Sequence, residues 1–121
     1  MNFNIKNIGQ TALAVFVFHP FTAFLIAINN LKSKYSFTVI FLFFVLFGYT
    51  FNAVNESADS YHYIEGFNNY IKNPTYNFIR DIKQYFTFDS YIKDIYVITS
   101  YYIVSFVTDN YHFLMALWAA I

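Results

Sequence analysis

The sequence predicts an all-α fold, a polytopic transmembrane helical protein with a polar, partly helical interfacial insert. Two observations support this fold class. Of the 121 residues, 58% are hydrophobic and only 12% are charged, whereas an ordinary soluble domain is about 45–50% apolar and about 25% charged. The apolar residues also form four runs, and a short soluble chain buries too little surface to hide them. We therefore expect the whole chain, 1–121, to be a single membrane region.

The first two apolar runs are expected to be transmembrane helices at about 9–29 and 37–54. About 20 apolar residues are needed to cross the hydrocarbon core of a bilayer. The first run contains Pro20, which is expected to kink the helix because proline removes a backbone hydrogen bond. A cleaved signal peptide is the competing interpretation of this run. The centre of the second run, 39–47, has no polar side chain, which indicates a helix that is apolar on all sides.

A polar insert at 55–90 is expected to lie outside the membrane. It holds most of the charged residues, and its Tyr and Phe side chains beside Lys and Arg suit the level of the lipid headgroups. Apolar residues recur at helical spacing on both sides of Asn73-Pro74, which breaks helices. We expect two short helices on or near the surface. The positive-inside rule, applied to Lys32 and Lys34, places the insert on the extracytoplasmic side, whereas a raw count of basic residues favours the opposite orientation.

The remaining apolar runs predict a third transmembrane helix at about 91–107 and the start of a fourth at 111–121. Asp89 or Ser90 is a candidate N-cap of the third helix, and the polar turn 108–110 has the capping residues that a following helix needs. The fourth run is too short to cross the bilayer. We therefore expect the chain to be the N-terminal part of a longer protein; the alternative is a true terminus buried at mid-depth or an interfacial hairpin.

Charge and composition argue against several classes of partner and cofactor. Seven basic and seven acidic residues give a formal net charge of zero, so the chain lacks the basic footprint of a nucleic-acid-binding protein. There is no cysteine to form a disulfide or a thiolate metal site. The sequence also has no glycine-rich phosphate loop or nucleotide fingerprint. We expect no cofactor, no metal and no nucleic acid.

The candidate catalytic residues are Asp59 and Glu56, which follow the second apolar run. A helix would place these two carboxylates near one face, where they could serve general acid–base chemistry or bind a cation. The alternative, which the spacing alone favours, is that they stabilise the first turn of a helix. His62 and Tyr63 follow directly and are candidate substrate-binding residues. A lone histidine is more often a surface residue or a packed one, and no second histidine lies nearby to complete a zinc site.

Arg80, the only arginine, is the third candidate substrate-binding residue. Its planar guanidinium suits a phosphate or a carboxylate, and a diphosphate-linked donor would need such a group. The alternative, favoured by the pattern, is a surface pair with Asp81 or a contact with lipid headgroups. His19 is a further candidate, because an ionisable group inside a membrane often has a function; it lies nearer the interface in the alternative interpretation.

Three features of the chain resemble one known family. A short basic connection at 32–34 precedes an aromatic-rich run. Asp59, Tyr63 and Phe67 are spaced as in a Gly-Thr-Asp-x-x-x-Tyr-x-x-x-Phe motif, and 105–112 is similar to a turn before a later helix. On these residues the chain resembles the EpsG family of bacterial exopolysaccharide biosynthesis proteins, which is related to the Wzy-like polymerases.

The chain also departs from this family at two places. The family commonly has an arginine a few residues before the aspartate, near the position of Thr50 here, and Ser57-Ala58 stands where Gly-Thr is common. Asp59 is the catalytic candidate that the resemblance carries over. Glu56 and Arg80 are candidates from their own chemistry.

The resemblance implies an activity that polymerises or transfers lipid-linked sugar repeat units at the outer face of the bacterial cytoplasmic (inner) membrane, in a multi-pass protein. The partners it implies are the lipid bilayer, an undecaprenyl-diphosphate-linked glycan and other membrane proteins of polysaccharide assembly. The second hypothesis is a non-enzymatic membrane subunit or scaffold of a polysaccharide assembly or transport complex.

Overall fold

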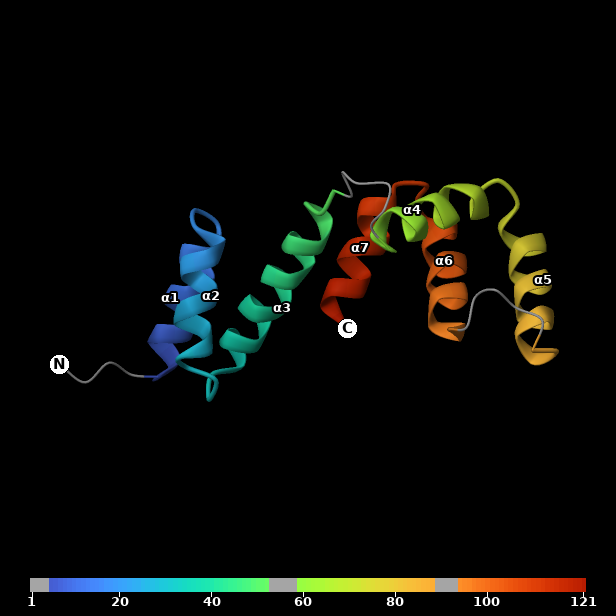
Figure 1. Ribbon diagram of the computed structural model, residues 1–121. Helices are drawn as coiled ribbons and strands as arrows, with labels where there is room; N and C mark the ends of the chain where they lie inside the picture. The colour runs from blue at the N-terminus through green and yellow to red at the C-terminus, as the bar shows by residue number, and fades with distance from the viewer. Residues whose placement is uncertain (1–4, 53–58, 89–93) are drawn as a thin grey trace. The chain divides into compact units, whose positions relative to one another are not determined.

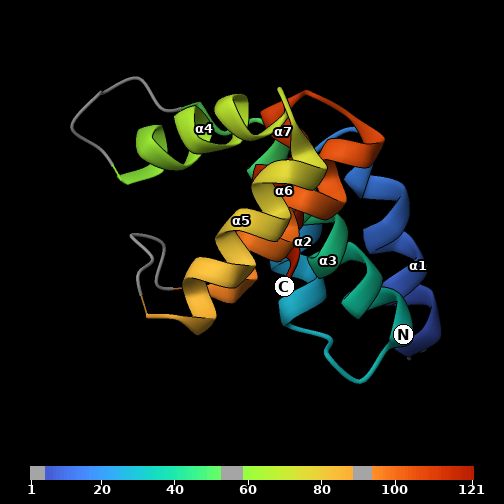
Figure 2. The ribbon, with the colours of Figure 1, turned by 90° about the vertical axis from the view of Figure 1, so that its right-hand side faces the viewer.

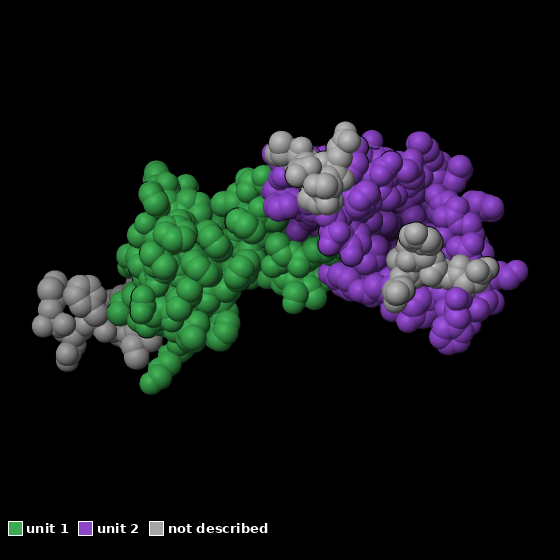
Figure 3. All heavy atoms as spheres, in the orientation of Figure 1, with its two compact units in different colours: residues 1–50, 116–121 green, residues 51–115 purple. Residues whose placement is uncertain are grey.

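The computed structural model describes residues 5–52, 59–88 and 94–121, which form seven α-helices and no strand (Figure 1). Two units can be distinguished. The first comprises 1–50 with 116–121, and the second comprises 51–115, as coloured in Figure 3. The helical character agrees with the prediction, while the arrangement into short helices differs from it.

The first unit contains α1 (Ile5–Phe16), α2 (Pro20–Ile28) and α3 (Lys34–Tyr49). The run expected to form one kinked helix is divided into α1 and α2, which lie side by side as a helical hairpin (Figure 1). Pro20 stands at the first position of α2, where its missing N–H costs nothing. The ring of His19 accepts from the N–H of Thr22 at 3.4 Å and bonds to its hydroxyl at 2.9 Å. His19 is therefore an exposed N-cap, which is the local reason for the break.

Small side chains allow the three helices of the first unit to approach closely. A hydrogen bond from Ser36 Oγ to the carbonyl of Asn30, at 2.8 Å, ties the start of α3 to the end of α2. Gly9 lies so near the side chain of Ser33 that a Cβ atom there would collide with its hydroxyl. Phe24 stacks on Phe43 with ring centroids 4.2 Å apart. The completely buried core residues are Ala12, Ala23, Ala27 and Val39.

The second unit is built from α4 (Asp59–Tyr70), α5 (Pro74–Phe86), α6 (Ile95–Val107) and the first half of α7 (Tyr111–Ala120). The two short helices expected on either side of Asn73-Pro74 are confirmed, with Pro74 in the first turn of α5. Asp94 caps α6, because its carboxylate accepts from the N–H of Tyr96 at 2.8 Å. The candidate caps Asp89 and Ser90 lie outside the described residues.

The turn before α7 caps that helix as expected. Asn110 Oδ1 accepts from the N–H of His112 at 3.0 Å, and the hydroxyl of Thr108 accepts from the N–H of Asn110 at 3.1 Å. These two bonds satisfy backbone donors that a helix start leaves without intrahelical partners.

Aromatic side chains join the helices of the second unit. Tyr101 of α6 meets Phe67 and Tyr70 of α4, with ring centroids 5.7 Å and 5.5 Å away. Phe78 of α5 stacks on Tyr102 of α6 at 4.1 Å, and the two helices lie side by side in Figures 1 and 2. α6 is thus the element against which α4 and α5 are both positioned.

The predicted transmembrane fold class is wrong. None of the helices described in 5–52, 59–88 and 94–121 combines the length and apolar character needed to cross a bilayer. The longest of them, α3, has 16 residues and extends about 24 Å, whereas the hydrocarbon core is about 30 Å thick. Spans at 9–29, 37–54 and 91–107 are replaced by shorter helices because Pro20, Thr50 and Asp94 set helix ends inside these runs. The predicted multi-pass localisation in the bacterial inner membrane is overturned by the same finding.

Candidate functional site

A pocket of about 270 Å³ lies between α4, α5 and α6 in the second unit. Its lining combines amide, guanidinium, carboxylate and phenol groups in a small volume. We call it the α4–α5–α6 pocket. The lining residues are Gly66, Asn69, Tyr70, Asn77, Arg80, Asp81 and Tyr101.

The helix–turn–helix formed by α4 and α5 brings most of these side chains together. Asn69 and Tyr70 end α4, and Asn77 and Arg80 lie on successive turns near the start of α5. The side-chain amide of Asn77 donates to the carbonyl of Tyr70 at 3.1 Å, which ties the two helices across the turn at Asn73-Pro74. The pocket therefore depends on the turn at this dipeptide.

α4 and α5 form two sides of the pocket, and Tyr101 of α6 forms the third. Its hydroxyl donates to the main-chain carbonyl of Tyr63 at 2.6 Å. This approach requires the absence of a side chain at Gly66, because a Cβ atom there would lie 2.9 Å from the Tyr101 hydroxyl. Burial raises the pKa of Tyr101, so the phenol stays neutral and keeps its proton for the hydrogen bond.

Arg80 and Asp81 form an ion pair in the pocket wall. Arg80 Nε donates to Asp81 Oδ1 at 2.7 Å; the Asp81 side chain is 5% exposed and that of Arg80 is 46% exposed. The hydrogen bond that Arg80 donates to the Asp81 carboxylate raises the pKa of Arg80. Because the contact uses Nε, the two terminal nitrogens of the guanidinium remain without a hydrogen-bond partner in the described part of the chain.

The hydroxyl of Tyr70 is the other open polar group in the pocket. The residue is 4% exposed, and among the described residues its hydroxyl has no hydrogen-bond partner. Burial, reinforced by Asp81 and Tyr102, raises the pKa of Tyr70, so the group is a neutral phenol that can both donate and accept. Leaving such a group unsatisfied costs about 1–3 kcal/mol, which a bound polar ligand would recover.

The structure places some of the predicted site residues at this pocket and others away from it. Arg80 lines it. Tyr63 contributes its carbonyl to Tyr101, while its own side chain is 41% exposed. Asp59 and His62 are exposed at the start of α4 and are not among the lining residues, and Glu56 lies outside the described residues.

Two of the alternatives considered from sequence agree with this geometry. Asp59 lies in the first turn of α4, where a carboxylate is stabilised by the helix dipole. Arg80 pairs with Asp81, but this pair borders a pocket and its carboxylate is buried.

Sequence reasoning missed Tyr70, Asn69, Asn77 and Tyr101 as pocket residues. Tyr70, Asn69 and Asn77 could have been found from the sequence, because polar side chains that flank the turn of a predicted helix–turn–helix come close together. No such signal existed for Tyr101, which comes from a distant segment. The described residues contain no cluster of three or more His, Cys, Asp or Glu side chains that could hold a metal ion, and the pocket chemistry suits a polar organic ligand.

No protein-family model, curated protein or solved structure matches this chain. The resemblance to the EpsG family therefore remains a prediction made from a short motif.

Proposed function

We propose that the chain takes part in the assembly of bacterial exopolysaccharide or capsule, and that its α4–α5–α6 pocket binds a phosphate-linked sugar unit. One observation supports this most strongly: the open end of the Arg80 guanidinium, the buried Asp81 carboxylate and the open Tyr70 hydroxyl share one small pocket. The glycan class comes from the EpsG-like spacing of Asp59, Tyr63 and Phe67.

The lining groups match the hydrogen-bonding groups of such a ligand. Sugar hydroxyls donate well to carboxylate and amide oxygens, here those of Asp81, Asn69 and Asn77, and accept from amide and phenol donors. A phosphate suits the two terminal nitrogens of Arg80, because a guanidinium binds it through two parallel hydrogen bonds. A volume of about 270 Å³ is close to the lower limit of about 300 Å³ for small-molecule pockets, so it fits one sugar residue and its phosphate.

Binding and catalysis are separate parts of this proposal. A general base must come within hydrogen-bond reach of the proton it removes, and Asp59 does not line the pocket. This separation favours the second candidate function, a non-enzymatic component that holds the glycan within a polysaccharide assembly. In the first candidate, Asp59 deprotonates an acceptor hydroxyl that approaches from outside the pocket.

Titration with glucose 1-phosphate and with glucose tests the binding proposal. We expect amide resonances of Gly66, Asn69 and Asn77 to shift on adding glucose 1-phosphate, and Arg80→Gln to weaken binding about tenfold or more, because a charge-assisted hydrogen bond contributes about 1.5–3 kcal/mol. Lys83→Gln is the matched control, since it removes a positive charge from the exposed side of the same helix. Equal affinity of the wild-type and Arg80→Gln proteins, or shifts confined to other residues, would contradict the proposal.

A variant at Asp59 separates the two candidate functions. Asp59→Asn in the producing cell is expected to abolish polymer if the chain is a transferase, and to leave polymer length unchanged if it is a scaffold. Binding of glucose 1-phosphate by purified Asp59→Asn should be normal in both cases. Loss of that binding would show that Asp59 acts on the fold or the pocket instead.

A further inference from the structure

One side of α5 exposes a row of apolar and basic side chains. Tyr76, Ile79 and Phe86 are 68%, 62% and 69% exposed, and Lys83 is exposed between them. Their spacing of three, four and three residues keeps all four on one side of the helix. We call these four residues the outer face of α5.

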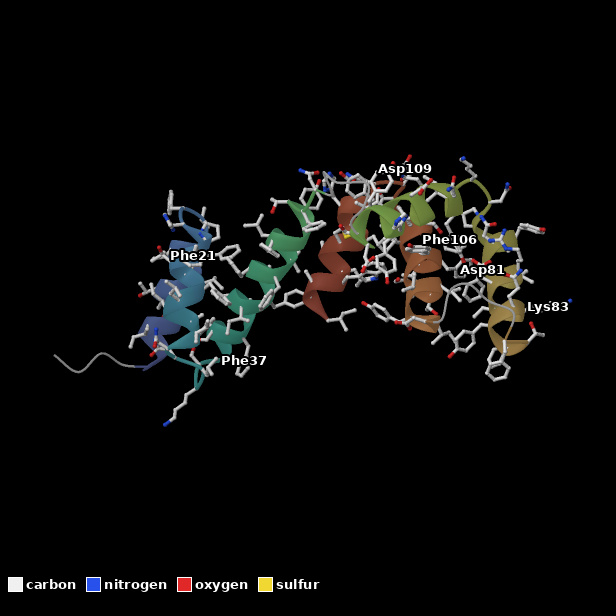
Figure 4. All side chains as sticks on the ribbon, in the orientation of Figure 1. Phe21, Phe37, Asp81, Lys83, Phe106 and Asp109 are labelled. Carbon is white, nitrogen blue, oxygen red and sulfur yellow. The ribbon has the colours of Figure 1, made fainter. Side chains whose placement is uncertain are left out.

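The opposite side of α5 holds the helix in the second unit. There Asp81 is 3% exposed and Phe78 stacks on Tyr102 of α6. Figure 4 shows Asp81 on the side of α5 that faces α6 and Lys83 on the side that faces away from it. Of the four outer-face residues, none lines the α4–α5–α6 pocket, and the face and the pocket meet only where the guanidinium of Arg80 lies 6.0 Å from the ring centre of Tyr76.

The charge on the exposed side of α5 has one sign. Lys83 and Arg80 are both basic, and the only acidic residue of the helix, Asp81, is buried and paired with Arg80. Two copies of this face brought together would place like charges opposite one another, which disfavours self-association. The outer face of α5 is complementary to a partner whose surface is negatively charged and covers an apolar layer.

We propose that the outer face of α5 binds the surface of a membrane that contains anionic phospholipid. The helix would lie parallel to the membrane plane with the rings of Tyr76 and Phe86 at headgroup level. Lys83 lies between them, where its apolar stem contacts the acyl boundary and its ammonium group reaches lipid phosphates. This binding requires no helix to cross the membrane, and it stands independently of the proposed sugar binding.

Flotation of the full chain with lipid vesicles tests the inference. We expect binding to vesicles of phosphatidylcholine mixed with phosphatidylglycerol, weaker binding to phosphatidylcholine alone, and loss of binding as salt is raised. Lys83→Gln should weaken binding about fivefold and Phe86→Ser about tenfold, from the electrostatic and apolar contributions of single residues. Circular dichroism of each variant checks that the helices are retained.

Matched controls come from the first unit. Phe37 is 63% exposed, close to the exposure of Phe86, and Lys32 is likewise exposed. Phe37→Ser and Lys32→Gln should leave vesicle binding unchanged. The inference would be overturned if these controls weaken binding as much as Lys83→Gln and Phe86→Ser do, or if neutral vesicles bind equally well. Preferential binding of polyglutamate over vesicles would also overturn it, because it would point to an acidic protein partner.

Discussion

The hydroxyl of Tyr101 donates to the main-chain carbonyl of Tyr63 at 2.6 Å, joining α6 to α4 across 38 positions of sequence. That carbonyl lies inside a helix, where an oxygen has a second lone pair available for an additional donor. The bond positions the phenol against Gly66 and so shapes one wall of the α4–α5–α6 pocket. It is a tertiary contact on which the candidate site depends.

Tyr101→Phe is expected to lower the free energy of unfolding by about 1–2 kcal/mol, because it removes a hydrogen bond of a residue that is only 3% exposed. Urea denaturation measures the change. Tyr76→Phe is the matched control, because Tyr76 is 68% exposed and should lose nothing measurable. An equal effect of both variants would show that the Tyr63 contact adds no stability.

Gly66→Ala is expected to destabilise the protein by about 1 kcal/mol, since the new Cβ atom would meet a Tyr101 hydroxyl that is held by its own hydrogen bond. In a Tyr101→Phe background that hydroxyl is gone, and the higher helix propensity of alanine, about 0.8–1.0 kcal/mol, should make the same change neutral or stabilising. A double-mutant cycle by denaturation measures this coupling. If the effects of Gly66→Ala and Tyr101→Phe on the free energy of unfolding are additive, the close approach of the Tyr101 hydroxyl to Gly66 is contradicted.

Stability should fall as the pH rises above about 10. Burial raises the pKa of Tyr70 and of Tyr101 in the folded state, while an unfolded tyrosine titrates near pH 10. Above that pH the unfolded chain releases protons that the folded chain keeps, so the free energy of unfolding decreases by about 1.4 kcal/mol per pH unit for each such tyrosine. The stabilisation is fully present below pH 10 and is lost as the pH rises toward the folded-state pKa.

Tyr70→Phe should reduce this alkaline slope by the contribution of one proton. At neutral pH the same change is expected to leave stability unchanged or raise it by about 1 kcal/mol, because it removes a buried hydroxyl without a partner among the described residues. Denaturation at pH 8 and at pH 11 measures both effects. A slope that is unchanged in Tyr70→Phe would contradict the assigned burial of this phenol.

Asp94→Ala is expected to cost about 1 kcal/mol, because the carboxylate caps α6 by accepting from the N–H of Tyr96. Asp94→Asn should retain most of the cap. Asp109→Ala removes an exposed carboxylate that caps no helix, so the free energy of unfolding should change little. Thermal unfolding ranks the three variants, and equal losses at Asp94 and Asp109 would indicate a general charge effect instead.

The helical segments of the second unit follow directly from local sequence signals. Asn73-Pro74 ends one pattern and begins the next, and α4 and α5 lie on either side of it. The Thr108-Asp109-Asn110 turn likewise marks the start of α7. These features involve residues close in sequence, so their chemistry could be recognised without the tertiary structure.

The membrane prediction is wrong because each long apolar run of the sequence was interpreted as one uninterrupted helix. Pro20 does not kink one long helix; with the His19 cap it ends the first helix and starts a second that turns back beside it. Whether a chain continues through a proline depends on the packing of the helices around it. In the first unit, buried Ala12, Ala23 and Ala27 make the hairpin a close-packed arrangement.

The candidate site was predicted only in part. Arg80 could be chosen by its chemistry alone, being the one planar guanidinium in the chain. Asp59 was chosen from its spacing to Glu56 and from the EpsG-like motif, and His62 because it follows in the same segment. The helix places both on exposed positions, eight or more residues before Tyr70. Proximity in sequence does not bring side chains together on a helix unless their spacing matches its turns.

By itself, the sequence determined that the chain is helical, where the polar breaks at Asn73-Pro74 and 108–110 fall, and that Arg80 carries the one guanidinium. Only the tertiary structure decided that the first apolar run is a hairpin, that Asp81 is buried against Arg80, and that Tyr101 meets α4 at Gly66. The physical reason is that caps and breakers act within one turn of helix, whereas burial and the pairing of distant polar groups depend on which helices pack together.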